Sequence, residues 1–214
     1  MKYKAILFDL DGTLLDTIDD LRDSMNKALA KFGYPQISVD EAKSFVGSGV
    51  ERFLELALPE GKENKNFDEA LEFFKQDYSK NMFHKTGPYK GIMELLKTVK
   101  ERGYKTAIVS NKFDKAVKEL TPIYFENYID YAVGESESER KKPAPDLIFK
   151  ALELLEVEKD DAVYIGDSDV DANTALNANM DFIGVSWGFR KKELLYSLGA
   201  KVVIDSPDQL LEEV

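Results

Sequence analysis

The sequence predicts an α/β fold: a doubly wound, Rossmann-like core with a mostly parallel sheet, and an inserted all-helical domain. One observation behind this prediction is a series of short, apolar, β-branched runs that suit strands buried on both faces of a sheet. Another is that helical patterns lie between these runs, as in βαβ units. The strand-like runs occupy residues 4–8, 106–109, 162–165 and 182–185, with weaker ones at 131–133 and 202–204.

Three helical patterns accompany the strands of the predicted core. Apolar residues from Ile92 recur at helical spacing until Gly103, a residue type that commonly ends a helix. A second pattern follows Pro145, which suits the first turn of a helix. A third pattern includes Ala172 and Leu176. Strands and helices therefore alternate through the second half of the chain.

The segment from residue 17 to residue 86 breaks this alternation, because it shows helical stripes and no strand pattern. One stripe starts at Ile18, and we expect Asp16 to be the N-cap of that helix. The sequence therefore predicts a core domain from residues 1–16 and 87–214 and an inserted helical domain from residues 17–86. The alternative is a set of extra helices packed on the sheet.

Composition excludes several classes of protein. The chain has 214 residues and a net charge of −11, which argues against nucleic-acid binding. It has no cysteine, so thiolate nucleophiles are excluded, and its single histidine, His84, rules out multi-histidine metal sites. No apolar stretch reaches membrane-spanning length and no signal-peptide pattern follows Met1. We therefore expect a cytoplasmic protein that binds no membrane, as a monomer or homodimer.

Polar residues directly follow three of the predicted strands. They are Asp9, Asp11 and Thr13 after residues 4–8, Ser110 and Asn111 after residues 106–109, and Asp167 and Asp171 after residues 162–165. A single aspartate after a strand is most often a helix N-cap. The carboxyl ends of parallel strands, however, meet at one rim of the sheet, where ligands bind in open α/β folds. The sequence therefore predicts a site at this rim, to which Lys142 would add a positive charge.

The residue types at this rim indicate phosphate chemistry. Asp9 and Asp167 would bring negative charges together, and Mg²⁺ is the simplest compensation because it prefers oxygen ligands. Since Mg²⁺ usually keeps substrate phosphate oxygens as ligands, we expect a small phosphorylated metabolite as substrate. Without cysteine in the chain or histidine at the rim, a carboxylate is the expected nucleophile. Ser110 and Asn111 would donate hydrogen bonds to phosphate oxygens, and Lys142 would supply a fixed charge.

The spacing of Asp9 and Asp11 suits two different roles. Residues two positions apart on an extended segment point to the same side. One carboxylate can then attack phosphorus while the other acts as general acid and afterwards as general base. Gly12 permits a sharp turn between them, and Thr13 can donate a hydrogen bond near the phosphate.

These residues resemble the motifs of the haloacid dehalogenase (HAD) superfamily of Mg²⁺-dependent phosphohydrolases. The matching positions, in motif order, are Asp9-x-Asp11-Gly12-Thr13, Ser110, Lys142 and Gly166-Asp167-x-x-x-Asp171. The resemblance implies Asp9 as the nucleophile, which forms an aspartyl-phosphate, and Asp11 as the acid and base. It implies that Asp9, Asp167 and the main-chain carbonyl of Asp11 hold the metal, with Asp171 supporting bound water. It also implies that residues 17–86 are a C1-type cap.

Further segments resemble the phosphoglycolate phosphatase subfamily and imply 2-phosphoglycolate as substrate. They are residues 14–17, 45–49, 110–112, 142–145 and 186–190. Gly47, Ser48 and Gly49 would direct main-chain N–H groups toward the site when the cap closes, and Arg52 would meet a substrate carboxylate. The alternatives are a plain interhelical turn at residues 47–49 and an ordinary surface role for Arg52.

Other activities of the same fold stay open, namely pyrophosphatase, nucleotidase, and sugar-phosphate phosphatase or mutase. The cap lacks the basic motif and the histidine of the mutase groups. Asp11 argues against a dehalogenase, because a halide leaving group needs no proton. From a different class, the chain could be a phospho-receiver or a non-catalytic binding module. Asp11 argues against a receiver as well, because an acid and base would shorten the lifetime of an aspartyl-phosphate.

Overall fold

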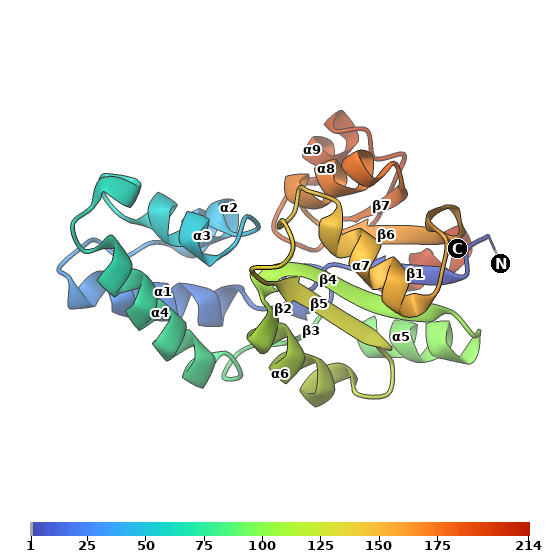
Figure 1. Cartoon of the computed structure of the whole chain (residues 1–214), viewed down its shortest axis with the longest axis horizontal. Coiled ribbons are helices and arrows are strands. Elements are labelled where there is room, and N and C mark those ends of the chain that lie inside the picture. The colour runs from blue at the N-terminus through green and yellow to red at the C-terminus, as the bar shows by residue number, and fades with distance from the viewer. Residues whose placement is uncertain (1) are drawn as a thin grey trace. The chain divides into compact units, whose positions relative to one another are not determined.

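The computed structural model describes residues 2–214, so Met1, with which the predicted core domain begins, lies outside the described residues. The chain divides into two compact units, one of Met1–Leu15 with Pro88–Val214 and one of Asp16–Gly87. Figure 1 shows a sheet flanked by helices in the first unit and helices packed against one another in the second. The short strands β2 (Leu15–Asp16) and β3 (Gly87–Pro88) form a two-stranded sheet.

The first unit is built around a parallel sheet of six strands in the order β5-β4-β1-β6-β7-β8. The strands are β1 (Ala5–Phe8), β4 (Lys105–Phe113), β5 (Tyr131–Glu135), β6 (Ala162–Gly166), β7 (Asp181–Val185) and β8 (Val202–Ile204). After β1 the chain adds β4 and β5 on one side and then returns to add β6 on the other. The predicted doubly wound α/β fold is confirmed, and its switch point, where ligands bind in such folds, lies at β1.

Helices cover both faces of this sheet (Figure 1). They are α5 (Ile92–Glu101), α6 (Asp114–Phe125), α7 (Asp146–Leu155), α8 (Asp169–Ala178), α9 (Lys192–Ser197) and α10 (Leu210–Glu213), with 3-10 turns at Lys159–Asp161 and Pro207–Gln209. On one face, Leu7, Val109 and Tyr164 pack into a core with apolar residues of α7 and α8. Their strand neighbours Ile6 and Ile165 are buried as well, so the central strands are covered on both sides.

The second unit contains four α-helices and a 3-10 turn. They are α1 (Ile18–Lys31), α2 (Val39–Phe45), α3 (Val50–Ala57), the turn Gly61–Glu63, and α4 (Phe67–Asn81). Phe74 of α4 stacks on Tyr78 and meets the ring of Phe53 edge-on. Across residues 2–214, no helix is both long and apolar enough to cross a membrane.

Two local expectations differ from the structure. Thr17 is the N-cap of α1, so the prediction of Asp16 as N-cap is wrong by one residue. Asp16 Oδ1 still accepts a hydrogen bond from the Ile18 N–H, at 3.4 Å, because the short side chain folds back on its own main chain. Helix α6 had no predicted counterpart, and Pro122 lies inside it.

Candidate active site

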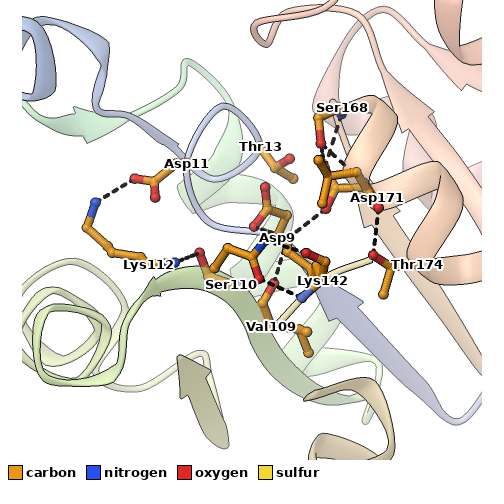
Figure 2. A network of polar contacts seen from close by, with 12 residues as sticks. Asp9, Asp11, Thr13, Val109, Ser110, Lys112, Lys142, Ser168, Asp171 and Thr174 are labelled. Carbon is orange, nitrogen blue, oxygen red and sulfur yellow. Dashed lines mark hydrogen bonds and ion pairs between the residues drawn. The ribbon is translucent and has the colours of Figure 1, made fainter. Parts of the chain in front are cut away.

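The predicted polar residues of the first unit meet at the carboxyl rim of the sheet (Figure 2). Asp9 follows β1, and its main-chain N–H bonds to the Ile165 carbonyl of β6 at 2.8 Å. Ser110 belongs to β4, Asp167 follows β6, and Lys142 comes from the loop between β5 and α7. All four of these polar side chains are buried, because the rim lies beneath the loops that follow the strands.

The ammonium of Lys142 is the centre of the site. Lys142 Nζ lies 2.7 Å from Asp9 Oδ1 and 2.7 Å from Asp171 Oδ1. It also donates to the hydroxyl of Tyr164 at 2.9 Å and to the Val109 carbonyl at 3.2 Å. An isolated buried ammonium is very costly, and these oxygens compensate it. The lysine therefore links the first and last predicted motifs.

Both carboxylate oxygens of Asp171 are engaged. Its Oδ1 accepts from Lys142 and from the Tyr164 hydroxyl, the latter at 2.8 Å. Its Oδ2 accepts from the Ser168 main-chain N–H at 3.1 Å and from the Ser168 hydroxyl at 2.5 Å. The Ser168 hydroxyl in turn accepts from the Asp171 N–H, so the two residues form the capping box of α8. Asp171 thus starts a helix and anchors Lys142.

The side-chain amide of Asn111 pairs with the main chain of Lys142. Asn111 Nδ2 donates to the Lys142 carbonyl at 2.9 Å, and Asn111 Oδ1 accepts from the Lys142 N–H at 2.7 Å. The sequence predicted a hydrogen bond from Asn111 to phosphate and did not predict this pairing. Asn111 consequently fixes the loop that delivers Lys142 to the site.

Asp167 is fully buried, and main-chain atoms pack closely around its carboxylate. Its carboxylate accepts hydrogen bonds from the Thr13 hydroxyl at 3.2 Å and from the Phe189 main-chain N–H at 2.6 Å. Gly12 adopts a φ of +90°, and a Cβ there would lie 2.6 Å from Asp167 Oδ2. A Cβ on Gly188 would lie 2.3 Å from Asp167 Cβ. Only glycine fits at these two positions, because the main chain closes directly around the carboxylate.

Asp11 lies apart from this cluster (Figure 2). Its Oδ1 accepts from Lys112 Nζ at 2.8 Å, and the two side chains are 14% and 3% exposed. The main-chain N–H of Lys112 donates to Ser110 Oγ at 3.2 Å. Asp9 and Asp11 therefore meet two different lysines, although they are only two residues apart.

The carboxylates of Asp9, Asp167 and Asp171 could hold a metal ion, since one oxygen of each lies within 4.8 Å of the others. Burial and the charge of Asp171 raise the pKa of Asp9 well above its usual value, and the same causes raise the pKa of Asp167 to about 7. Burial opposes the charge of Lys142, but Asp171 and Asp9 outweigh it and raise the pKa of the ammonium. One ammonium does not neutralise three buried carboxylates, so the residues present fit a hard divalent cation.

The predicted cap residues belong to the second unit. Gly47 and Gly49, between α2 and α3, have positive φ values of 127° and 88°. Ser48 lies between them and is half-buried. Arg52, on α3, pairs with Glu55 Oε1 at 2.8 Å, with its side chain 48% exposed. The roles of these residues toward a substrate remain predictions.

Tyr164, Lys112 and Phe189 are among the residues of the site that the sequence did not predict. Tyr164 lies in the apolar run of β6 and looks like a core aromatic, although a buried tyrosine hydroxyl needs a partner and was a usable signal. Lys112 follows Ser110 and Asn111, but nothing in its spacing connects it with Asp11. The Phe189 N–H is a main-chain group, so the sequence carries no signal for it.

A doubly wound sheet with a buried lysine and three clustered aspartates at its carboxyl rim defines an α/β enzyme with an acidic site suited to a metal ion. The chain belongs to the haloacid dehalogenase-like hydrolase family, whose sequence profile matches residues 6–185. The predicted superfamily is therefore confirmed.

Individual relatives cover nearly the whole chain. The chain is 34% identical to a phosphoglycolate phosphatase from Aquifex aeolicus over 88% of this chain and 87% of that protein. It is 31% identical to a phosphoglycolate phosphatase from Psychrobacter arcticus over 99% of this chain and 96% of that protein. The crystal structure of a predicted phosphoglycolate phosphatase from Lactobacillus delbrueckii subsp. bulgaricus has a TM-score of 0.94 at 38% identity, covering 100% of this chain and 98% of that chain.

Proposed function

We propose that this chain is a Mg²⁺-dependent phosphomonoester hydrolase that works through an aspartyl-phosphate on Asp9. Its substrate is a small phosphorylated metabolite in the cytoplasm, with 2-phosphoglycolate as the first candidate. The observation that carries the proposal is the buried Asp9 carboxylate held by Lys142 at 2.7 Å beside two further aspartates. The names of the relatives from Aquifex aeolicus and Psychrobacter arcticus support the substrate.

The first step transfers the phosphoryl group to the protein. A carboxylate oxygen of Asp9 forms a bond to phosphorus, and the bond between phosphorus and the leaving-group oxygen breaks. Asp11 in its protonated form gives its proton to that oxygen, so the product leaves as a neutral hydroxyl. Lys142 orients Asp9, and its charge opposes the rise in the pKa of Asp9 that burial and Asp171 cause.

The second step releases inorganic phosphate. Asp11, now a carboxylate, takes a proton from water as the water oxygen bonds to phosphorus, and the bond between phosphorus and Asp9 breaks. Ser110 of β4 lies at the same rim, where its hydroxyl can meet a phosphoryl oxygen. Asp9 is regenerated as a carboxylate, and Asp11 ends protonated for the next cycle.

The metal would be held by Asp9, Asp167 and the main-chain carbonyl of Asp11, with Asp171 supporting bound water. When bound, Mg²⁺ neutralises the clustered carboxylates and withdraws charge from the phosphoryl oxygens. Thr13 and the Phe189 N–H hold Asp167 for this task. The second unit acts as a cap, in which Gly47, Ser48, Gly49 and Arg52 select the substrate.

The test is a panel of phosphate compounds with and without Mg²⁺, including 2-phosphoglycolate, inorganic pyrophosphate, nucleotides, sugar phosphates and p-nitrophenyl phosphate. We expect hydrolysis that EDTA abolishes and Mg²⁺ restores, with no turnover by Asp9→Asn. Mg²⁺ should also raise the melting temperature of the wild-type protein but not of Asp167→Asn. Absence of hydrolysis of every phosphomonoester would refute the proposal, and preferred hydrolysis of pyrophosphate or a nucleotide would replace the substrate.

Arg52 provides a separate test of the substrate. Arg52→Ala should raise KM for 2-phosphoglycolate, which carries a carboxylate, more than KM for p-nitrophenyl phosphate, which carries none. Equal effects on the two substrates would remove Arg52 from the substrate-binding residues.

A further inference from the structure

The strand that carries Ser110 has an irregularity that determines where the next side chains point. Val109 of β4 pairs with Val133 of β5, whereas Phe113 pairs with Glu135, so four steps along β4 match two along β5. A bulge of this kind breaks the regular alternation of side chains and redirects them, often beside active sites. Lys112 lies within the bulge, and its side chain is directed to Asp11 (Figure 2).

The ion pair between Lys112 and Asp11 lies in a largely dry position. The lysine side chain is 3% exposed, and the carboxylate of Asp11 is 14% exposed. Burying a lysine and a carboxylate is costly unless they are paired. The ammonium nitrogen of Lys112 donates to Asp11 Oδ1 at 2.8 Å. Lys112 therefore holds Asp11, the second aspartate of the Asp9-x-Asp11 motif.

The main chain beside Asp11 leaves the direction of its carboxylate to the side-chain rotamer. Asp11 forms a β-bridge with Leu15, and the N–H of Gly12 bonds to the Leu15 carbonyl at 2.9 Å, so this turn is fixed. Rotation about the Cα–Cβ bond of Asp11 is the remaining freedom, and it decides whether the carboxylate reaches the leaving group. Lys112 restricts that rotation by holding Oδ1.

We infer that Lys112 is a positioning residue that sets the orientation of the Asp11 carboxyl group for proton transfer to the leaving group. The inference deepens the proposed function and rests on it, since it assumes that Asp11 is the acid and base. Lys112 touches neither phosphate nor the reacting oxygen in this account. Its effect must therefore depend on how much the leaving group needs a proton.

The experiment compares two aryl phosphates of similar shape, p-nitrophenyl phosphate and phenyl phosphate. Nitrophenolate leaves readily without a proton, whereas phenolate needs one. Lys112→Met should lower kcat/KM for phenyl phosphate about 10-fold more than for p-nitrophenyl phosphate, because kcat/KM reports the transfer to Asp9. Lys112→Arg, which keeps the charge, should recover part of the loss.

Two controls separate this role from a structural one. Lys115→Met carries the same substitution three residues later, where the side chain is 78% exposed, and should change neither value. In an Asp11→Asn background, Lys112→Met should cause no additional leaving-group dependence, since the positioned group is gone. An equal loss on both substrates, or the same extra loss in the Asp11→Asn background, would overturn the inference.

The outcomes also separate the inference from the proposed function. If the wild-type protein hydrolyses neither aryl phosphate, the proposed function fails before Lys112 is tested. If it hydrolyses both and Lys112→Met shows no leaving-group dependence, only the inference fails. If the melting temperature shows that Lys112→Met folds poorly, Lys112→Arg decides instead. A ratio of kcat/KM for the two aryl phosphates that lies between those of the wild type and Asp11→Asn supports the inference. A ratio equal to that of the wild type refutes it.

Discussion

Lys142 holds Asp9 through an ion pair of 2.7 Å in which the lysine side chain is 2% exposed and the carboxylate 9%. The same nitrogen pairs with Asp171 at 2.7 Å. Asp9 follows β1 and Asp171 belongs to α8, which follows β6, so Lys142 connects the chain segments after these two strands. Lys142 therefore both compensates the charge of the two carboxylates and holds their chain segments together.

Replacing Lys142 should damage activity and stability together. Lys142→Met would leave Asp9 and Asp171 as like charges without their shared cation, so we expect kcat to fall at least about 100-fold and the melting temperature to drop. Turnover of p-nitrophenyl phosphate and thermal unfolding measure the two effects. Lys141→Met is the matched control, since Lys141 is 38% exposed and pairs only loosely with Glu135 at 3.5 Å. Wild-type turnover in Lys142→Met would contradict the account.

The raised pKa of Asp167, about 7, predicts how the metal-free protein responds to pH. Between its ordinary value of 3.8 and about 7, the folded protein keeps a proton that the unfolded chain has lost. Asp167 therefore favours folding less and less as pH rises through this window, and its effect levels off above about pH 7. In urea unfolding with EDTA, the stability of the wild type relative to Asp167→Asn should therefore fall as the pH rises from about 4 to about 7.

The informative quantity is the difference in the free energy of unfolding between the wild type and Asp167→Asn at each pH. Surface carboxylates act in the opposite direction, since hydrogen bonds from Arg140 lower the pKa of Asp146 and stabilise the fold as pH rises. Such contributions are common to the wild type and to Asp167→Asn and cancel in the difference. A difference that does not change between about pH 4 and pH 7 would contradict the burial of an ionisable Asp167.

Asn111 should affect activity and stability because its side chain holds the main chain of Lys142. Asn111→Ala removes both hydrogen bonds to the Lys142 main chain and leaves a buried N–H and carbonyl unpaired, which costs about 1–3 kcal/mol of stability. We also expect kcat to fall, because the loop no longer fixes the ammonium. Asn177→Ala is the control, since Asn177 lies on α8 at an exposed position and donates a hydrogen bond to the Pro143 carbonyl of the same loop. Equal effects of the two variants would argue against a special role for Asn111.

A buried carboxylate in the second unit should stabilise its last segment. Asp20 accepts from the N–H groups of Lys85 and Thr86, both at 2.9 Å, and from the Thr86 hydroxyl at 2.9 Å. Asp20→Ala removes these hydrogen bonds, so we expect a loss of about 1–3 kcal/mol and faster hydrogen exchange at the two amides. Asp19→Ala, at a side chain that is 49% exposed, should change neither. Unchanged exchange in Asp20→Ala would contradict this role.

Sequence reasoning reached the fold and the rim because both depend on patterns that the chain carries locally. Apolar runs located the strands, and the position of Asp9 and Asp167 directly after such runs located the rim. The parallel arrangement then required these carboxylates to meet, because all the strands end at the same edge. Asp16 was misplaced by one residue as N-cap, since two adjacent residues, Asp16 and Thr17, both suit a cap.

The contacts within the site were less predictable. The bulge in β4 directs Lys112 to Asp11, and a regular strand pattern contains no sign of it. The sequence predicts that Asn111 donates to phosphate, but it carries no sign that the Asn111 amide also pairs with the Lys142 main chain. Tyr164 has the same apolar context as its neighbours, so its hydroxyl contact with Asp171 emerges only from the fold. Long-range partners of this kind depend on side-chain direction rather than on spacing.

The central claim is that Asp9 is the nucleophile, and the position of the transferred phosphoryl group tests it most directly. Asp11→Asn should slow release of the phosphoryl group, so protein mixed with p-nitrophenyl phosphate and Mg²⁺ can be quenched in acid, digested and measured by mass spectrometry. We predict that the peptide containing Asp9 gains the mass of one phosphoryl group and that the Asp9→Asn, Asp11→Asn double variant gains none. A phosphoryl group on another residue, or none on a protein whose wild type turns over the same substrate, would contradict the account.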